Sequence, residues 1–499
     1  MLSITYKILE KLIYHRIKSP IDAILPDYEA GFREHRGCVG QVLALTTHIE
    51  VGFQLNLKTA LALIDLSSAY DTVWRIGFLW KFYNVVPCKR LGKLISSMLT
   101  NRTFRVYIND SSSRPRVLNN GFPQGSVCAP IFFNLYTSDM PATKSRKFSF
   151  ADDLGLTIQV IFFETAEKIL ERDMKTMKVY YRKWCLCMNE GKSEVAIFHL
   201  NNKMANRPLN VYLDGKEIPF NKTPTYLGLP LDRSLTFKPA LTKLSEKLKP
   251  RNNLVQKLVG TNWGANGNTL RTAVLSLVYS AAEYCAPVWY NSSHVNKIDT
   301  QLNCAMRTVT GSVDSTPVPW LHVMSNIAPP HLRRKLAANK EWNKCFNGPT
   351  NYSLPMKIEL EEPPPTRLTS RSPIWNDTSI QAEDFNINDT WKSYWANSFE
   401  FTNKSLVEDP HEKLEGFNLD RREWRILNRF RCGHGCCAQQ LHRWNFANSP
   451  SCDCDASTVQ SMSHVLSDCP IRRFGGSLSD LNSVTTEAVE WLTSLDIEI

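Results

Sequence analysis

The sequence lacks any continuous apolar run of 18 or more residues. A membrane-spanning helix needs about 20 mostly apolar residues, so no membrane span is expected. The chain also lacks the apolar core and cleavage site of a secretory signal peptide, because its first residues form a charged amphipathic stretch with Lys7, Lys11 and Arg16. These absences predict an intracellular, soluble protein.

Glycine and proline, at 22 and 27 of 499 residues, are too sparse for a collagen-like or low-complexity chain, and there is no internal repeat. A hydrophobic content of 43% with 21% charged residues is typical of a folded protein. At roughly 100 to 200 residues per domain, the length predicts about three units. Lysine and arginine outnumber acidic residues by 59 to 48, and the net charge of +11 is compatible with a polyanionic partner without identifying one.

The apolar pattern predicts a mixed region followed by a helical one. Helical spacing predicts helices that include 4–24, 41–57 and 165–186, and short apolar runs predict strands at 61–66, 148–150, 154–160 and 195–199. Because strands and helices intermix, residues 61–235 are expected to form one α+β domain. From Leu235 to Ala338 the pattern predicts mainly helices, and a break at 359–373 that is rich in Pro, Ser and Thr is expected to be a linker.

Fourteen cysteines are present, and eight of them are scattered without pairing rhythm through the first 350 residues. Most of these eight are expected to be buried thiols. The other six lie between Cys432 and Cys469 together with three histidines, which in a reducing compartment favours metal ligation over disulfides. The spacing Cys-x-Cys-x9-His-x4-Cys suits a closed tetrahedral zinc site formed by Cys452, Cys454, His464 and Cys469. A helix beginning near His464 is expected to direct its ring to the Cys-x-Cys loop. The alternative is that these thiols are incidental.

Two further patterns precede this module. A weaker set of candidate ligands for a second metal site comprises Cys432, His434, Cys436, Cys437 and His442. Beside it, basic residues are interleaved with tryptophan in a pattern that suits single-stranded RNA, whose bases stack on aromatic rings: Arg421, Arg422, Trp424, Arg425, Arg429 and Arg431.

Three aspartates occupy positions where a carboxylate is costly. Asp65 ends a predicted buried strand, and Asp152 and Asp153 lie at the tip of a predicted apolar hairpin. If they converge, their repulsion is relieved by a pair of divalent cations about 3.5 to 4 Å apart, the arrangement that two-metal phosphoryl transfer requires. Taken singly, an aspartate after a strand is more typical of a turn or a helix N-cap than of a metal site.

Five motifs in order carry a resemblance. They are LALIDLSSAYD (61–71), GFPQGSVCAPIFFNLY (121–136), FSFADDLGL (148–156), MNEGKSEVAIF (188–198) and YLGLPLDRSLTF (226–237). This series resembles the palm motifs of reverse transcriptases, most closely the non-LTR retrotransposon enzymes of the jockey type. The resemblance implies a right-hand polymerase of α+β class with partial fingers (1–60), palm (61–235), helical thumb or connection (236–340), linker region (341–420) and a small Cys/His-rich zinc module (421–499).

The resemblance also implies an activity and residue roles. The expected activity is RNA-directed DNA polymerisation, with an RNA template, a DNA primer, dNTPs and two magnesium ions. Asp65, Asp152 and Asp153 would ligate the magnesium ions, and Lys192 would lie near the leaving pyrophosphate.

The resemblance assigns nucleotide-binding roles as well. Tyr70 would form the floor of the sugar pocket and exclude a 2′-hydroxyl, although without the resemblance it is a typical core aromatic. Gln124 and Gly125 would position template and nucleotide, whereas the plain interpretation of Pro-Gln-Gly is a turn. Arg33, in GFREHRG, would approach the template or the triphosphate.

A basic helix is the candidate for gripping the primer–template. Phosphate contacts are expected from Lys243, Lys247, Lys249 and Arg251, although charged helix faces are often only solvated. Pro250 is expected to interrupt this helix after Leu248.

Comparison with the family's pattern raises two alternatives. The chain begins within the fingers region and is expected to be a truncated copy, so it could be a catalytically inactive nucleic-acid-binding remnant. A structural zinc protein unrelated to polymerisation is the other alternative, and it predicts that Asp65 and Asp152 lie far apart.

Overall fold

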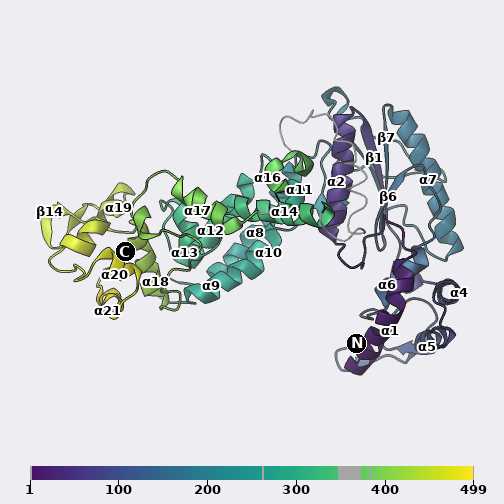
Figure 1. The fold of residues 1–499 in the computed structure, drawn as a ribbon, viewed down its shortest axis with the longest axis horizontal. Coiled ribbons are helices and arrows are strands. Elements are labelled where there is room, and N and C mark those ends of the chain that lie inside the picture. Colours follow the sequence, from purple (N-terminus) through teal and green to yellow (C-terminus); the bar gives the residue numbers. More distant parts are fainter. Residues whose placement is uncertain (1–2, 261–262, 347–372, 383–384, 498) are drawn as a thin grey trace. The chain divides into compact units, whose positions relative to one another are not determined.

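The computed structural model describes residues 3–260, 263–346, 373–382, 385–497 and 499. The chain folds as two compact units. The first unit comprises Met1–Pro239 and Glu341–Asp377, and the second comprises Ala240–Lys340 and Thr378–Ile499. Figure 1 shows the α+β character of the first unit and the mainly helical character of the second.

A four-stranded antiparallel sheet organises the first unit. Its strand order is β6-β7-β1-β8, formed by β6 (Arg146–Phe150), β7 (Asp153–Val160), β1 (Lys58–Ile64) and β8 (Glu194–Phe198). The predicted strands at 61–66, 148–150, 154–160 and 195–199 correspond to these four, and the predicted α+β class is confirmed. Only two residues separate β6 from β7, so the end of this hairpin is a tight turn.

Helices cover both faces of the sheet (Figure 1), with α2 (Cys38–Gln54) on one side and α7 (Phe163–Lys183) on the other. Because side chains alternate along a strand, Ala60, Ala62 and Ile64 face the main core with α6 (Ala129–Thr137) and α7. Thr59 faces α2, where a Cβ on Gly52 would lie only 2.6 Å from its Oγ1. The same alternation directs Asp65, the residue after β1, to the α2 face.

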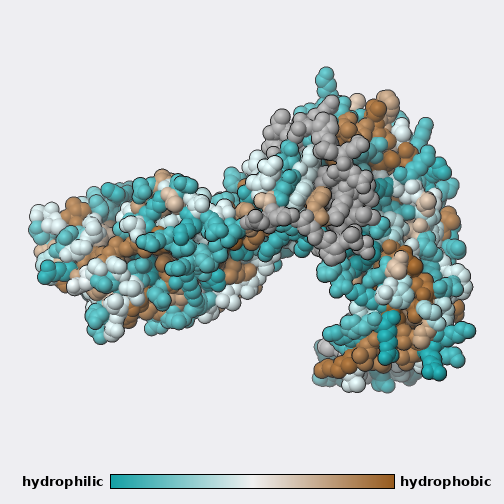
Figure 2. All heavy atoms as spheres, viewed as in Figure 1, coloured by the Kyte–Doolittle hydropathy of each residue, from teal (hydrophilic) through white to brown (hydrophobic). Residues whose placement is uncertain are grey.

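The remaining described elements of the first unit are helices and short strand pairs outside this sheet. Among the described residues of this unit, the other α-helices are α1 (Ile4–Asp22), α3 (Ala69–Thr72), α4 (Arg75–Val85) and α5 (Lys89–Leu99), with a 3-10 turn at Asn202–Met204 and another at Ile374–Asn376. Short strand pairs are β2 (Arg102–Phe104) with β5 (Arg116–Leu118), β3 (Tyr107–Ile108) with β4 (Ser111–Ser112), β9 (Tyr212–Leu213) with β10 (Lys216–Glu217), and β11 (Thr225–Tyr226) with β12 (Leu229–Pro230). Apolar side chains also reach the surface over α1 (Figure 2), among them Ile4, Ile8 and Leu12.

Helices dominate the second unit. They begin with α8 (Lys238–Gln256), α9 (Gly267–Val274), a π-helical turn (Leu275–Tyr279), α10 (Ser280–Ala282), α11 (Ala286–Trp289), α12 (Asn296–Thr310), α13 (Val318–Ser325) and α14 (Pro330–Phe346). After residue 377 follow α16 (Thr378–Gln381), α17 (Ile387–Ala396), a 3-10 turn (Lys404–Leu406), α18 (Arg421–Cys432) and α19 (Ala438–Arg443). The C-terminal part contains β13 (Ser451–Cys452), β14 (Asp455–Val459), a π-helical turn (His464–Asp468), α20 (Leu478–Asn482) and α21 (Thr486–Ser494).

The prediction that Pro250 interrupts the basic helix is wrong, because α8 continues through it to Gln256. Proline removes one backbone hydrogen bond from a helix interior. Here burial of Leu248, Asn252 and Val255 stabilises the turns around the proline. The Asn252 amide also donates to the Gln301 carbonyl at 3.0 Å, which ties α8 to α12.

The predicted linker at 359–373 lies outside the described residues except for Pro373. Within the wider linker region of 341–420, α17 supplies Trp391 and Trp395, which are buried in one apolar cluster with Trp320. None of the described helices is both long enough and apolar enough to span a lipid bilayer.

Candidate active site and metal centre

The sheet brings the three predicted carboxylates to one end. Ile64 of β1 lies opposite Leu154 of β7, so the next register position places Asp65 opposite Asp153. Residues directly opposite in an antiparallel pair have Cβ atoms about 5 Å apart. Asp152 is the neighbour of Asp153 in the β6–β7 turn. Asp65 and Asp152, which are 87 positions apart in the sequence, therefore meet at one edge of the sheet.

The charges of Asp152 and Asp65 act on the Asp153 carboxyl. The pKa of the Asp153 carboxyl is raised because the surrounding protein desolvates it and because Asp152 and Asp65 repel its negative charge. Burial, and then the negative charge of Asp152, raise the pKa of Tyr70 as well. Hard divalent cations prefer such a set of carboxylate oxygens and relieve its repulsion, so the donor chemistry fits magnesium.

The turn that carries Asp152 and Asp153 is strained. Ala151 has a φ of 58°, a left-handed backbone conformation that costs a residue other than glycine about 1 to 2 kcal/mol. Phe150 and Asp153 pair across this turn. Surrounding contacts are therefore required to keep the carboxylates in place.

A loop after α7 fixes the backbone of Asp65. The Asp65 N–H donates to Ser193 Oγ at 3.2 Å, and the Asn189 N–H donates to the Asp65 carbonyl at 2.8 Å. Ser193 Oγ in turn donates to the Asn189 carbonyl at 2.7 Å. Lys192 belongs to this loop and is exposed, so its chain position is tied to the carboxylate edge. Ser193 was missed from the sequence, because a serine in a loop carries no distinguishing signal.

Tyr70 joins the carboxylate edge to α6. Its ring stacks on Phe133, with centroids 4.6 Å apart and planes at 21°. Its hydroxyl is buried and has no hydrogen-bond partner among the described residues. The Tyr70 carbonyl accepts the Phe122 N–H at 2.9 Å, which attaches the Gly-Phe-Pro-Gln-Gly loop to this position.

The same loop contains two glycines with positive φ. Gly121 has a φ of 79°, and a Cβ there would lie 2.6 Å from the Asp71 carbonyl oxygen. Gly125 has a φ of 80°, but no atom lies within 4 Å of a Cβ built on it. Gln124 Nε2 lies 3.4 Å from Asp71 Oδ1. Asp71 thus contacts the loop through Gln124.

The Arg33 guanidinium binds backbone carbonyls of its own segment. Its Nη1 donates to the Pro26 carbonyl at 2.9 Å and to the Glu29 carbonyl at 3.3 Å. These bonds hold the segment before α2.

Three of the four predicted nucleic-acid-binding residues on α8 are exposed, namely Lys243, Lys247 and Lys249. With 3.6 residues per turn, Lys243 and Lys247 share one side of the helix, and Lys249 projects from another. Arg251 is half-buried and donates to the Leu277 carbonyl. The helix therefore offers a common cationic face formed mainly by the first two lysines.

The prediction that the basic stretch of α18 stacks on RNA is wrong for its main residues. Arg421, Trp424, Arg425, Arg429 and Arg431 are all buried. Arg421 donates to the Val309 and Thr308 carbonyls, each at 3.0 Å. Arg431 Nη2 donates to the Glu415 and Asn482 carbonyls at 2.8 Å, and burial lowers its pKa to about 9. A guanidinium has five N–H donors, so these arginines serve the backbone of their own unit.

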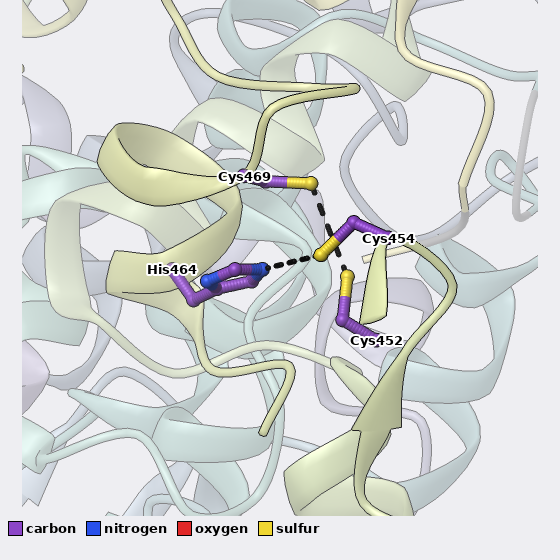
Figure 3. Close-up of side chains that lie close together, drawn as sticks. All are labelled: Cys452, Cys454, His464 and Cys469. Atoms are coloured by element: carbon purple, nitrogen blue, oxygen red, sulfur yellow. Dashed lines mark hydrogen bonds between the residues drawn. The ribbon is translucent and has the colours of Figure 1, made fainter. Parts of the chain in front are cut away.

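The predicted zinc ligands converge in the second unit (Figure 3). The candidate ligand atoms of Cys452, Cys454, His464 and Cys469 all lie within 4.8 Å of one another. Cys454 Sγ is 3.3 Å from His464 Nε2, and the Sγ atoms of Cys452 and Cys469 are 3.9 Å apart. Tetrahedral coordination with Zn–S near 2.3 Å separates sulfurs by about 3.8 Å and sulfur from nitrogen by about 3.6 Å. These four side chains therefore fit a zinc ion.

Neighbouring residues orient the cluster. His464 begins a π-helical turn that ends at Asp468, and the Cys469 N–H donates to the His464 carbonyl at 2.8 Å. Gln460 is buried, and its Nε2 lies 3.7 Å from Cys452 Sγ. Arg472 donates to Asp453 at 2.9 Å, which holds the Cys-x-Cys loop.

The weaker prediction of a second metal site is not supported. Within the described ranges, none of its five predicted residues belongs to a group of three or more His, Cys, Asp or Glu side chains whose ligand atoms converge as those of the zinc cluster do. Cys432 Sγ lies 3.8 Å from Thr316 Oγ1, Cys437 is in the apolar core, and His442 Nδ1 contacts the Ala447 carbonyl at 3.0 Å.

A family model and curated proteins are similar to this chain. Residues 1–231 match the family described as reverse transcriptase (RNA-dependent DNA polymerase). The chain is 29% identical over 333 residues to the probable RNA-directed DNA polymerase from transposon BS of Drosophila melanogaster, covering 62% of this chain and 35% of that protein. It is 27% identical over 335 residues to the RNA-directed DNA polymerase from mobile element jockey of the same species, covering 63% and 35%.

The chain matches about a third of the length of these curated relatives. Among solved structures, apo telomerase from Candida tropicalis is similar with a TM-score of 0.37 and 12% identity, covering 70% of this chain and 58% of that chain. Residues 1–231 are thus a reverse transcriptase domain, and the chain is a homologue of the RNA-directed DNA polymerases of non-LTR retrotransposons.

Proposed function

We propose that this chain is an RNA-directed DNA polymerase of a non-LTR retrotransposon, transferring a nucleotide from a dNTP to a primer 3′-hydroxyl. The observation that carries the proposal is the meeting of Asp65, Asp152 and Asp153 at one edge of the sheet, inside a domain of the reverse transcriptase family.

In this proposal the three aspartates hold two magnesium ions. When bound, the ions lower the pKa of the primer hydroxyl and neutralise charge on the pyrophosphate. Asp65 and Asp152 are the main ligands, and Asp153 lies beside them. The Ser193 and Asn189 bonds to the Asp65 backbone keep its carboxylate from drifting away from the hairpin.

Nucleotide binding is assigned to the residues around Tyr70. The Tyr70 ring, held against Phe133, forms the floor of the sugar pocket, where a 2′-hydroxyl would clash. Gln124 and Gly125 position template and nucleotide, and Lys192 protonates or stabilises the departing pyrophosphate.

Arg33 contributes indirectly in this proposal, since its guanidinium holds the carbonyls of Pro26 and Glu29 and so supports the fingers segment. Residues 1–60 act as partial fingers, 61–235 as palm and 236–340 as helical thumb or connection. Lys243 and Lys247 on one side of α8, with Lys249 on another side and the half-buried Arg251, contact the phosphates of the RNA template and DNA primer. The zinc bound by the C-terminal cluster is structural, because all four coordination positions are filled by protein.

Primer extension tests the proposal. Purified full-length chain with Mg²⁺, dNTPs and a DNA primer annealed to an RNA template is expected to extend the primer. Omitting Mg²⁺ abolishes extension, and Mn²⁺ restores it. Binding of the primer–template without extension in either metal would instead identify a nucleic-acid-binding remnant.

A further inference from the structure

A buried carboxylate contacts the turn that carries Asp152 and Asp153. Glu29, in the segment before α2, is 3% exposed. Its Oε1 accepts the Gly31 N–H at 2.6 Å and the Ala151 N–H at 3.0 Å. Its Oε2 accepts the Ser149 hydroxyl at 2.7 Å. One side chain therefore binds both the end of β6 and the strained residue that precedes Asp152.

The backbone of the Glu29 segment follows β6 closely. The Ala30 N–H donates to the Ser149 carbonyl, and the Ser149 N–H donates to the Tyr28 carbonyl, both at 2.9 Å. A Cβ on Gly31 would lie 2.5 Å from the Ala151 nitrogen, so no spare room separates the segment from the turn. Residues 28–31 thus form a rigid support for the hairpin end.

The chemistry of Glu29 suits this support. Burial raises the pKa of the Glu29 carboxyl, whereas the bonds from Ser149, Ala151 and Gly31 oppose that rise. Ala151 adopts its φ of 58° with its N–H directed to the carboxylate. Without that acceptor, the Ala151 N–H would be a buried donor lacking a partner, and the turn would relax to a different backbone conformation.

We propose that Glu29 is a positioning residue that holds the Asp152–Asp153 turn in the geometry needed to bind the divalent cations. The inference rests on the proposed function, because it concerns the same carboxylate edge. Metal sites tolerate displacements of only about 0.5 Å, and loss of a residue that orients a ligand typically weakens metal binding by about 10- to 100-fold.

The test compares Glu29→Ala with Glu29→Gln in the zinc-loaded full-length chain. Mn²⁺ affinity is measured by calorimetry, and kcat and the dNTP KM are measured by primer extension. Glu29→Ala is expected to weaken Mn²⁺ binding and lower kcat by at least about 10-fold, with KM changed less than about threefold. Glu29→Gln should recover most of both, because its carbonyl oxygen can still accept the Gly31 and Ala151 N–H groups.

Asp173→Asn is the matched control. Asp173 is also 3% exposed, and it accepts the Ser145 N–H at 2.6 Å near the opposite end of β6. A general loss of packing would affect this variant similarly, whereas the proposal predicts unchanged Mn²⁺ affinity. Unchanged Mn²⁺ affinity and kcat in folded Glu29→Ala would overturn the proposal.

Two further variants distinguish misfolding of Glu29→Ala, an error in the role of Glu29 and an error in the proposed metal site. If Glu29→Ala does not fold, Ser149→Ala removes the bond to Oε2 and is expected to weaken Mn²⁺ binding by about threefold; no change there would overturn the inference. Asp65→Asn tests the underlying site. If it also leaves Mn²⁺ binding intact, the metal site of the proposed function is wrong, whereas sensitivity of Asp65→Asn alone rejects only the role of Glu29.

Discussion

Alanine substitution at Gly121 and at Gly125 is expected to have different costs, although both glycines have φ near 80°. At either position an alanine in the left-handed region costs about 1 to 2 kcal/mol. At Gly121 the added Cβ would also lie 2.6 Å from the Asp71 carbonyl oxygen, a clash with backbone that cannot rotate away. Overpacking of this kind adds about 1 to 3 kcal/mol. Gly125 has no atom within 4 Å of its Cβ position and avoids this second cost.

The expected losses of unfolding free energy are therefore about 3 kcal/mol for Gly121→Ala and about 1 kcal/mol for Gly125→Ala. Urea unfolding followed by circular dichroism and tryptophan fluorescence measures both. With an m value of about 2 kcal/mol per molar urea, the midpoint of the first unit shifts by about 1.5 M and 0.5 M respectively. Equal shifts, or a larger shift for Gly125→Ala, would show that the close approach of the loop to Asp71 is not as described.

Three further predictions follow from the second unit. Dialysis of the denatured chain and refolding with zinc should give one zinc per chain by atomic emission. Gln460→Ala should weaken zinc binding about 10-fold or more, because the amide no longer contacts Cys452. Equal zinc affinity in this variant would show that Gln460 does not orient the Cys452 ligand. Lys247→Ala should reduce the log–log salt slope of primer–template binding by about 0.9, whereas removal of the buried, carbonyl-bound Arg421 should leave that slope unchanged in folded protein. Burial lowers the pKa of His322 in the folded protein to about 3, so between pH 6.5 and 3 the unfolded state binds more protons than the folded state, and stability should fall as pH decreases through this range. His322→Met should flatten this pH dependence in thermal melts. An unaltered profile would show that other groups cause the pH dependence.

Short sequence patterns predicted those parts of the two sites that are formed by residues close together in the sequence. The run ending at Asp65 and the apolar hairpin around Asp152 are strands because continuous apolar residues suit a sheet covered on both faces. The Cys-x-Cys and His-x4-Cys spacing predicted a cluster whose ligand atoms indeed converge, because each half forms within a short segment.

Non-local packing explains what the sequence did not reveal. Composition cannot distinguish an exposed arginine from Arg431, whose donors are taken by carbonyls brought from distant segments. The support that Glu29 provides depends on a contact with a residue 122 positions away. Pro250 remains helical because burial of its neighbours outweighs one missing hydrogen bond.

The most direct measurement of the central claim compares wild type with Asp152→Asn in single-nucleotide incorporation on an RNA template, alongside primer–template binding. Removing one carboxylate charge from the proposed cation site should abolish incorporation while binding stays within about twofold, since phosphate contacts provide most of the affinity. Incorporation by Asp152→Asn at the wild-type rate would contradict the assignment of the cations to this edge of the sheet.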